Sequence, residues 1–346
     1  MTLQINVSPG GLRHIRHAVP NQLRQWYGQV QEVVFSLESR RSEGRYGKGW
    51  DDEVDSLREF LEEVCSDHSK ARISVVDYSR DAGEAVSAAF FGGREVPEKD
   101  HSGAPILAYF QALLVPRFDH IFHIDSDMLF GGGSQTWAAE ARALLAERPD
   151  ALFCSPLSGP PTADGHIPAA VQERMARWGG MFHGREPGEV PTYSFGDVSS
   201  RIWFVDRARL KERITPLRLR RARLRWIPGH KGAAPTTLRA RVRARIKRRP
   251  HSASTEDTLS RAMREAGMVR LDYLGQEPGM WSLHPVAHDE RFYTELPRVV
   301  EIIESGDLPE GQLGDYNLND SLLTGQSAAA DVVDIPLWRR AVSRIS

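Results

Sequence analysis

Two aspartates at the end of a short apolar run are the residues of this sequence best suited to chemistry. Ile121, Phe122 and Ile124 form a β-prone run, and Asp125 and Asp127 follow it with one serine between them. A buried strand that ends in an Asp-x-Asp turn places carboxylate oxygens at the carboxyl edge of a sheet, where open α/β sheets bind ligands. Mg²⁺ and Mn²⁺ prefer such oxygens and usually bind through one or two carboxylates plus the phosphates of a substrate. The pattern therefore indicates a metal–diphosphate site.

A purely structural role for the same pair is the alternative. Asp side chains accept hydrogen bonds from nearby backbone N–H groups, so two aspartates close together are common in turns. The apolar run before the pair and the three glycines at 131–133 after it favour a ligand site.

The elements that would position these residues alternate between strand and helix in the first half of the chain. We expect strands at 3–7, 32–37, 72–76, 121–124 and 151–154, and helices at 12–27, 51–64, 103–115 and 137–147. This alternation is typical of parallel βαβ units. Because their connections are right-handed, the strand ends gather on one edge of the sheet.

The pattern changes after Ser155. We expect strands at 196–206 and 268–273, a capped helix at 255–267, a helix at 295–304 and a short basic amphipathic helix at 335–345. The chain is therefore expected to divide into residues 1–155, residues 156–325 and a tail at 326–346.

A strongly basic segment spans residues 207–249. It holds 17 Lys and Arg residues against one acid, Glu212, although the formal net charge of the whole chain is −1. Such segregation usually marks a surface that meets an anionic partner. The segment is interpreted as a lid over a diphosphate or an exposed loop, or else as a contact with an anionic membrane surface, which would suit the basic tail. Nucleic acid is the least favoured partner, since the segment has one aromatic residue, Trp226.

Composition places the protein among ordinary globular chains. It has 346 residues, of which 40% are hydrophobic, and no apolar run reaches the length of a membrane span. The first ten residues lack the basic start and apolar stretch of a secretory signal. The two cysteines, Cys65 and Cys154, have no partner at zinc spacing and are expected to be buried thiols. We therefore expect a cytoplasmic protein, either free or peripheral to the inner face of the membrane.

The order of these features resembles the GT-A fold glycosyltransferases, most of all the inverting enzymes of family 2. Three motifs carry the resemblance: the strand ending in Asp125-Ser-Asp127, the pair Glu256-Asp257 that opens a helix, and His284 within Trp-Ser-Leu-His-Pro. It covers about residues 3–290. The resemblance implies a Rossmann-like α/β fold with a mostly parallel central sheet flanked by helices. The first half would bind the nucleotide sugar and the second half the acceptor.

The implied activity is metal-dependent transfer of a sugar, of the hexosyltransferase kind, from a UDP- or GDP-sugar to an unknown acceptor hydroxyl with inversion. Mn²⁺ or Mg²⁺ would be held by Asp125, Asp127 and His284, with His288 as a weaker substitute for His284. Asp127 would be the direct ligand, while Asp125 would bind through water or hold the ribose. A cation that bridges the two phosphates acts as Lewis acid and template.

The resemblance also implies a base that takes the proton of the acceptor hydroxyl. Asp257 is the candidate, because the first turn of a helix favours an ionised carboxylate. Glu256 would bind the acceptor or orient the base. The alternative is that both acids only cap the helix. Arg201 is a candidate contact for the acceptor or the diphosphate.

The nucleotide would lie against the ends of the first three strands. Ser8, Pro9 and Gly10 follow the first strand and would approach the ribose or base closely, since Gly lacks a Cβ. Glu38 ends the second strand, where relatives often have Asp, and would accept from a uracil N–H or a ribose hydroxyl. Asp77, after the third strand, is the alternative.

Three other functions stay open. A retaining GT-A enzyme fits the same motifs. A sugar-nucleotide pyrophosphorylase shares the α/β layout but would need a glycine-rich, basic phosphate loop, which residues 8–11 match poorly. A non-catalytic anion-binding protein would be built around the basic segment.

Overall fold

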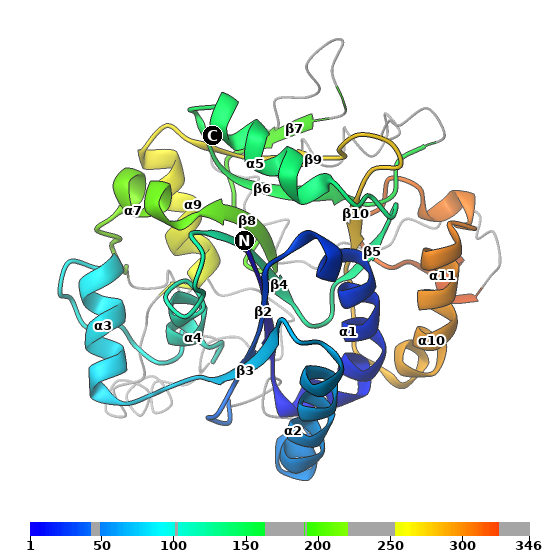
Figure 1. Ribbon diagram of the computed structural model, residues 1–346, viewed down its shortest axis with the longest axis horizontal. Helices are drawn as coiled ribbons and strands as arrows, with labels where there is room; N and C mark the ends of the chain where they lie inside the picture. The colour runs from blue at the N-terminus through cyan, green and yellow to red at the C-terminus, as the bar shows by residue number, and fades with distance from the viewer. Residues whose placement is uncertain (43–48, 101–102, 163–189, 191, 221–252, 325–346) are drawn as a thin grey trace, which may run out of the picture.

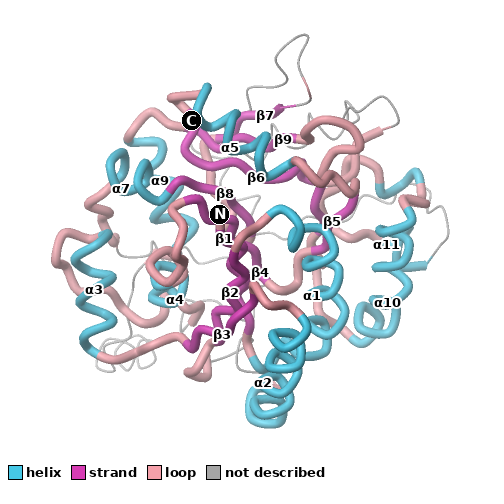
Figure 2. The backbone as a smooth tube through the Cα atoms, viewed as in Figure 1, coloured by secondary structure: helices cyan, strands magenta, loops and turns pink. Residues whose placement is uncertain are grey.

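The computed structural model describes residues 1–42, 49–100, 103–162, 190, 192–220 and 253–324. At the centre of these residues lies a ten-stranded mixed sheet, drawn in magenta in Figure 2. The strands are β1 (Thr2–Val7), β2 (Glu32–Leu37), β3 (Ala71–Val75), β4 (His120–Asp125), β5 (Leu129–Gly131), β6 (Ala151–Ser158), β7 (Thr192–Phe195), β8 (Ile202–Asp206), β9 (Val269–Tyr273) and β10 (Trp281–Leu283). Their main order is β3-β2-β1-β4-β8-β6-β10-β5, and β9 pairs with β6 and β7 off this path.

Helices cover both faces of the sheet (Figure 1). They are α1 (Leu12–Trp26), α2 (Trp50–Asp67), α3 (Arg80–Phe90), α4 (Ile106–Gln111), α5 (Trp137–Glu147), α7 (Arg207–Ile214), α9 (Thr255–Glu265), α10 (Glu290–Ser305) and α11 (Asp320–Thr324). One apolar core joins α1, α2 and α5 to the sheet, and a second joins α3, α4, α7 and α9. A third packs α10 against β5 and β10. None of the described helices is long and apolar enough to span a membrane.

The parallel strands β3, β2, β1 and β4 define the edge at which the site lies. Each of them pairs in parallel with its neighbour, so their carboxyl ends meet on one side. Strand β2 is buried along its whole length, as expected for a strand inside a parallel sheet covered on both faces. Strand β8 runs antiparallel to β4, with Ile202 opposite Ile124. The residues that precede β8 therefore lie beside the residue that ends β4.

Strands β5 and β10 bring a distant segment to the same edge. They pair antiparallel, with Trp281 opposite Gly131 and Leu283 opposite Leu129. Gly131 is required for this pairing, because a Cβ there would lie 2.2 Å from the ring of Trp281. The chain that leaves β10 is thus directed back toward the segment between β4 and β5.

The expected α/β fold with a mostly parallel central sheet flanked by helices is confirmed. Strands β1 to β4 each lie within one residue of the bounds expected from the sequence. The fifth expected strand, at 151–154, continues to Ser158, so the division expected at residue 155 falls inside β6.

Other expected elements differ from the structure. The helix expected at 103–115 is only α4, because Pro105 precedes its first turn and Gly103 has a left-handed conformation. The strand expected at 196–206 begins only at Ile202, and the helix expected at 295–304 starts earlier, after its cap Asp289.

Several described elements were not expected: α3, β5, β7, α7, β10 and α11. Of the basic segment, the structure describes 207–220, and helix α7 forms its start. Residues 221–249 and the tail at 326–346 lie outside the described residues.

Candidate active site

The Asp-x-Asp turn is held in place by groups that belong to neighbouring elements. Gln22 of α1 donates its side-chain amide to the backbone oxygens of Asp125 and Met128, at 3.1 and 2.8 Å. The backbone N–H of Ser126 donates to the carbonyl of Asn6 in β1, at 3.2 Å. Because these partners are fixed in a helix and a strand, the turn leaves the sheet edge in a defined conformation.

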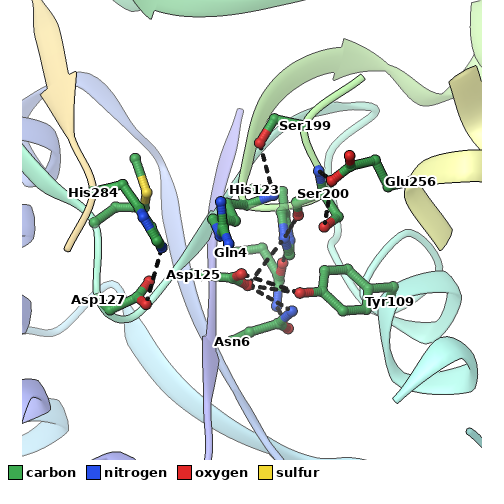
Figure 3. A network of polar contacts seen from close by, with 12 residues as sticks. Gln4, Asn6, Tyr109, His123, Asp125, Asp127, Ser199, Ser200, Glu256 and His284 are labelled. Carbon is green, nitrogen blue, oxygen red and sulfur yellow. Dashed lines mark hydrogen bonds and ion pairs between the residues drawn. The ribbon is translucent and has the colours of Figure 1, made fainter. Parts of the chain in front are cut away.

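Asp125 is bound by protein groups on several sides (Figure 3). The hydroxyl of Tyr109, from α4, lies 3.0 and 3.1 Å from its two carboxylate oxygens. The amide of Asn6 donates to Oδ1 at 3.4 Å, and Nε2 of His123 lies 3.7 Å from the same oxygen. The first aspartate of the pair is therefore oriented by its surroundings and is 22% exposed.

Asp127 has a different environment. Its Oδ2 lies 3.5 Å from Nε2 of His284 and 3.3 Å from Nε2 of His288. Its Oδ1 is buried and has no hydrogen-bond partner within the described residues. Burial acts to raise the pKa of Asp127, but the nearby imidazoles, His284 first, hold it well below its usual range. Asp127 is thus an ionised carboxylate with one oxygen left for a ligand, since an unpartnered buried acceptor is otherwise costly.

His284 reaches Asp127 because it directly follows β10. Its backbone N–H donates to the carbonyl of Tyr316 at 3.0 Å, and its carbonyl accepts from Leu318 at 2.9 Å, which fixes its position. Burial lowers the pKa of His284, although Asp127 opposes this effect. The ring is therefore favoured in its neutral form, which can offer a lone pair to a cation.

A third imidazole, that of His14 in α1, packs against the ring of His288. The two rings stack at 4.9 Å between centroids with an angle of 13°. Nε2 of His14 lies 3.3 Å from the hydroxyl of Ser126, and its Nδ1 is buried without a partner in the part of the chain that is described. Burial lowers the pKa of His14 from 6.5 to about 4.

Arg201 lies at the other side of the turn, just before β8. Its carbonyl accepts from the backbone N–H of Asp125 at 2.8 Å. Burial acts to lower the pKa of its guanidinium, but Tyr316 and the carboxylates of Asp127, Asp125 and Glu256 raise it above its usual value. The site therefore contains a fixed positive charge among three acids.

The two acids of the second motif open α9 at this edge. Ser254 caps the helix, and its side chain accepts from the backbone N–H of Asp257 at 3.0 Å. The carboxylate of Glu256 lies 3.5 Å from both the backbone nitrogen and the hydroxyl of Ser200. In Figure 3, Glu256 lies on the opposite side of Asp125 from His284. Glu256 thus borders the Asp-x-Asp site, and Asp257 is exposed in the same helical turn.

Glu38 has protein partners for both carboxylate oxygens. Oε1 accepts from the backbone N–H of Arg40 at 2.9 Å, and Oε2 accepts from the hydroxyl of Tyr78 at 2.7 Å and from the ammonium of Lys99 at 2.8 Å. The side chain is only 7% exposed. In this arrangement Glu38 positions Tyr78 and Lys99 at the end of β2.

The remaining expected nucleotide residues follow β1 and β3 on the same edge. Ser8 precedes a short 3-10 turn, Pro9–Gly11, that packs against the start of α2. Asp77 accepts from the backbone N–H and the hydroxyl of Ser79, at 2.7 and 3.0 Å, so it shapes the turn into α3. The structure brings these loops to the edge where Asp125 lies.

Sequence reasoning missed several residues of the site, above all Tyr109 and His14. A signal existed for α1, where the polar residues His14, Asn21, Gln22 and Gln25 are buried at helical spacing. A buried polar stripe on an amphipathic helix indicates partners across the interface. Tyr109 had no such signal, because it meets Asp125 only through the packing of α4.

A separate cavity lies at the opposite edge of the sheet, where β4 begins and β8 ends, and shares no residue with the site. It is lined by His120, Ala139, Arg142, Ala143, Leu145, Ala146, Asp206 and Arg209.

The donor set around Asp127 suits a divalent cation. Across the described ranges, no three Asp, Glu, His or Cys side chains are already gathered as a closed set of metal ligands. Even so, Asp127 offers a buried oxygen without a protein partner, and the nearby imidazoles add nitrogen donors. Carboxylate and imidazole together are accepted by Mn²⁺ and related cations.

Comparison with known proteins gives matches only among solved structures. No family model matches the sequence, and no curated protein matches it. The chain is similar to GalNAc-T7 with UDP, GalNAc and Mn²⁺, at 10% identity over 86% of this chain and 47% of that chain, with a TM-score of 0.45. It is similar to the galactosyltransferase LgtC in complex with donor and acceptor sugar analogues, at 11% identity over 86% and 95% of the two chains, with a TM-score of 0.37.

A UDP-glucose pyrophosphorylase complexed with UDP-glucose also matches, at 10% identity over 80% and 91% of the two chains, with a TM-score of 0.36. The chain spans about half the length of the GalNAc-T7 chain and of an S. aureus TarS chain, 47% and 48% respectively.

Proposed function

We propose that this protein is a metal-dependent glycosyltransferase of the GT-A type, which transfers a sugar from a nucleoside-diphosphate sugar to an acceptor hydroxyl with inversion. The proposal is carried by the unequal pair of carboxylates at the sheet edge. Asp125 accepts from Tyr109 and Asn6, whereas Asp127 keeps a buried oxygen without a partner among the described residues. A pair in which one carboxylate is held by the protein and the other keeps one oxygen without a described partner suits a cation shared with a diphosphate.

Asp127 and His284 would hold the cation, either Mn²⁺ or Mg²⁺, and Asp125 would reach it through water or hold the ribose of the donor. When bound, the cation supplies charge neutralisation to the leaving diphosphate. The lowered pKa of Asp127 keeps its carboxylate ionised, and the lowered pKa of His284 favours the neutral ring that can act as a ligand.

Arg201 would add a permanent positive charge beside the leaving group. Its neighbours Asp125, Asp127 and Glu256 raise its pKa, so it stays protonated at any physiological pH. A guanidinium that is already oriented by surrounding acids stabilises developing negative charge without reorganisation.

The acceptor would be activated from the side of α9. Asp257 is the proposed base and Glu256 the residue that binds the acceptor or orients that base. In an inverting reaction the acceptor attacks the sugar from the face opposite the leaving diphosphate, so this base would lie on that side. The N-terminus of α9 favours ionised carboxylates in its first turn.

The nucleotide would lie along the ends of β1, β2 and β3 in residues 1–155, against Ser8, Pro9, Gly10 and the loops that follow Glu38 and Asp77. The acceptor would be bound by residues 156–325. With this arrangement the two substrates would meet at the Asp-x-Asp turn, as transfer between them requires.

Ligand-induced stabilisation tests the proposal without knowledge of the acceptor. A ligand that binds the native state raises the melting temperature by mass action. UDP or GDP should stabilise the protein, with a larger shift when Mn²⁺ is added, and Asp127→Asn should abolish the Mn²⁺-dependent part. The matched control is Asp307→Asn, an exposed aspartate after α10. An Asp127→Asn protein that keeps the full Mn²⁺-dependent shift would overturn the proposal.

A further inference from the structure

Two histidines direct the same ring nitrogen at one oxygen of Asp127. Nε2 of His284 and Nε2 of His288 lie 3.5 and 3.3 Å from Oδ2. The two residues come from different positions, one directly after β10 and the other just before α10. A metal-binding role for His284 explains the contact between His284 and Asp127. It does not explain the contact between His288 and Asp127.

The two distances are long for hydrogen bonds but ordinary for ligands of a common cation. Well-formed N–H···O bonds have donor–acceptor distances of about 2.7–3.2 Å. Two ligands at about 2.1 Å from one cation, with angles of about 90–110°, are separated by about 3.0–3.4 Å. Asp127 also keeps its Oδ1 without a partner in the described chain. The geometry around Asp127 therefore resembles a set of ligands more than a hydrogen-bonded cluster.

His288 is held in this orientation by aromatic packing. Its ring stacks on His14 at 4.9 Å and contacts Phe292 at 5.3 Å between centroids. His14 is itself anchored by burial and by the hydroxyl of Ser126 at 3.3 Å. Gly11 leaves room for this ring, because a Cβ there would lie 2.8 Å from Cε1 of His14. His14 thus stacks on one face of the His288 ring and holds its plane.

We propose that His288 is a second imidazole ligand, which completes a two-histidine, one-carboxylate cation site with Asp127 and His284, and that His14 is its positioning residue. The inference rests on the proposed function, since it deepens the account of the same metal site. Nitrogen donors favour Mn²⁺, Co²⁺ and Zn²⁺ over Mg²⁺. The site is therefore selective for cations that accept imidazole.

Pulsed EPR of Mn²⁺ bound to the full chain with UDP or GDP tests the ligand count, because it detects nitrogen nuclei bound to the metal. We expect two imidazole nitrogens in the unmodified protein and one in either His284→Ala or His288→Ala. His68→Ala, a histidine that follows α2 and packs on Tyr27, should leave two. A single nitrogen in the unmodified protein, retained in His288→Ala, overturns the inference. The test does not depend on the folding of any variant, because the unmodified protein alone gives the number of metal-bound nitrogens.

The same experiment separates this inference from the proposed function. Mn²⁺ binding that depends on Asp127 but shows fewer than two nitrogens overturns the inference alone. If no Mn²⁺ binds with either nucleotide, the inference and the metal dependence of the proposed function both fail.

The role of His14 is tested by affinity. His14→Ala should weaken Mn²⁺ binding about 10-fold or more, the usual effect of losing a group that orients a ligand, and His14→Phe should restore part of it because a ring can still stack on His288. A purely structural role would lower the melting temperature of both variants and leave the Mn²⁺ affinity unchanged.

Discussion

The hydroxyl of Tyr109 lies 3.0 and 3.1 Å from the two carboxylate oxygens of Asp125, so the helix that precedes β4 holds the first acid of the Asp-x-Asp pair. The second acid, Asp127, has imidazoles on one oxygen and no described partner on the other. Two residues of the same type, two positions apart, therefore have different environments. We therefore propose that the first carboxylate is held in a fixed orientation by the protein and that the second binds the cation.

Tyr109→Phe should separate these roles. It removes a hydrogen bond to a charged group, which contributes about 1.5–3 kcal/mol, so we expect roughly a 10-fold or greater loss in the rate of nucleotide release from the donor sugar. Mn²⁺ affinity, measured by calorimetry, should change little because Asp127 is untouched. Tyr273→Phe, which removes a hydroxyl bonded to Glu140 instead, is the control and should keep its rate. Equal losses in both variants would contradict the assignment.

Arg201→Met should weaken donor binding. The substitution leaves Asp125, Asp127 and Glu256 without their shared positive neighbour, so repulsion of the diphosphate should raise KM for the donor sugar by about 10-fold or more. The measurement is KM and kcat for nucleotide release at saturating Mn²⁺. Arg291→Met, in an exposed ion pair with Asp320, is the control. An unchanged KM for the donor sugar would show that Arg201 does not contribute to donor binding.

Asp257→Asn should reduce turnover with little effect on donor binding. General-base catalysis contributes typically about 10²–10⁴-fold, so kcat for transfer should fall within that range while KM for the donor stays constant. Glu256→Gln should have a smaller effect, mainly on the acceptor. The anomeric configuration of the product, followed by NMR, checks the mechanism. A retained configuration, or full activity in Asp257→Asn, would rule out this base.

Gly131→Ala should disturb the site from a distance. A Cβ at this position would meet the Trp281 ring at 2.2 Å, and overpacking of a core costs about 1–3 kcal/mol. Because the pairing of β5 with β10 directs His284 to Asp127, Mn²⁺ affinity should fall together with the melting temperature. Gly83→Ala in α3, where an added Cβ meets nothing within 4 Å, should be neutral or slightly stabilising. Thermal unfolding and Mn²⁺ titration of both variants make the comparison.

His14 should make stability depend on pH. Burial lowers its pKa from 6.5 to about 4, so between these values the unfolded chain binds more protons than the folded chain. The free energy of unfolding should therefore fall as the pH drops from about 6.5 to about 4, by at most about 3 kcal/mol. Chemical denaturation with EDTA present measures this slope. His14→Gln should reduce the slope while His68→Gln should not, and part of it should remain because burial also lowers the pKa of His284.

Asp127 contributes to the same curve at a more acidic pH. Its folded pKa lies well below the usual value, so its contribution is complete above that usual value and is lost as the pH falls through the folded one. Its contribution is therefore lost at the acidic end of the curve. If the free energy of unfolding depends on pH near 5 as steeply in His14→Gln as in the unmodified protein, groups other than His14 cause that dependence.

The sequence by itself determined the alternation of strands and helices and the placement of the Asp-x-Asp pair after a buried strand. These features follow from local hydrophobic periodicity and turn chemistry, which is why β1 to β4 and α5 were predicted closely. The sequence also indicated His284 and Glu256 as residues of one site, and the structure places His284 against Asp127 and Glu256 against Ser200 at the same edge.

Only the tertiary structure decided how the two aspartates differ and which residues surround them. Tyr109 meets Asp125 because α4 packs over the end of β4, and His14 meets His288 because α1 packs against α10. The carboxylate of Glu38 accepts hydrogen bonds from Tyr78 and Lys99, and the position of Glu38 at the end of a strand does not predict these contacts. Such contacts join residues far apart in the chain, and their distances depend on how whole elements pack, which no local pattern specifies.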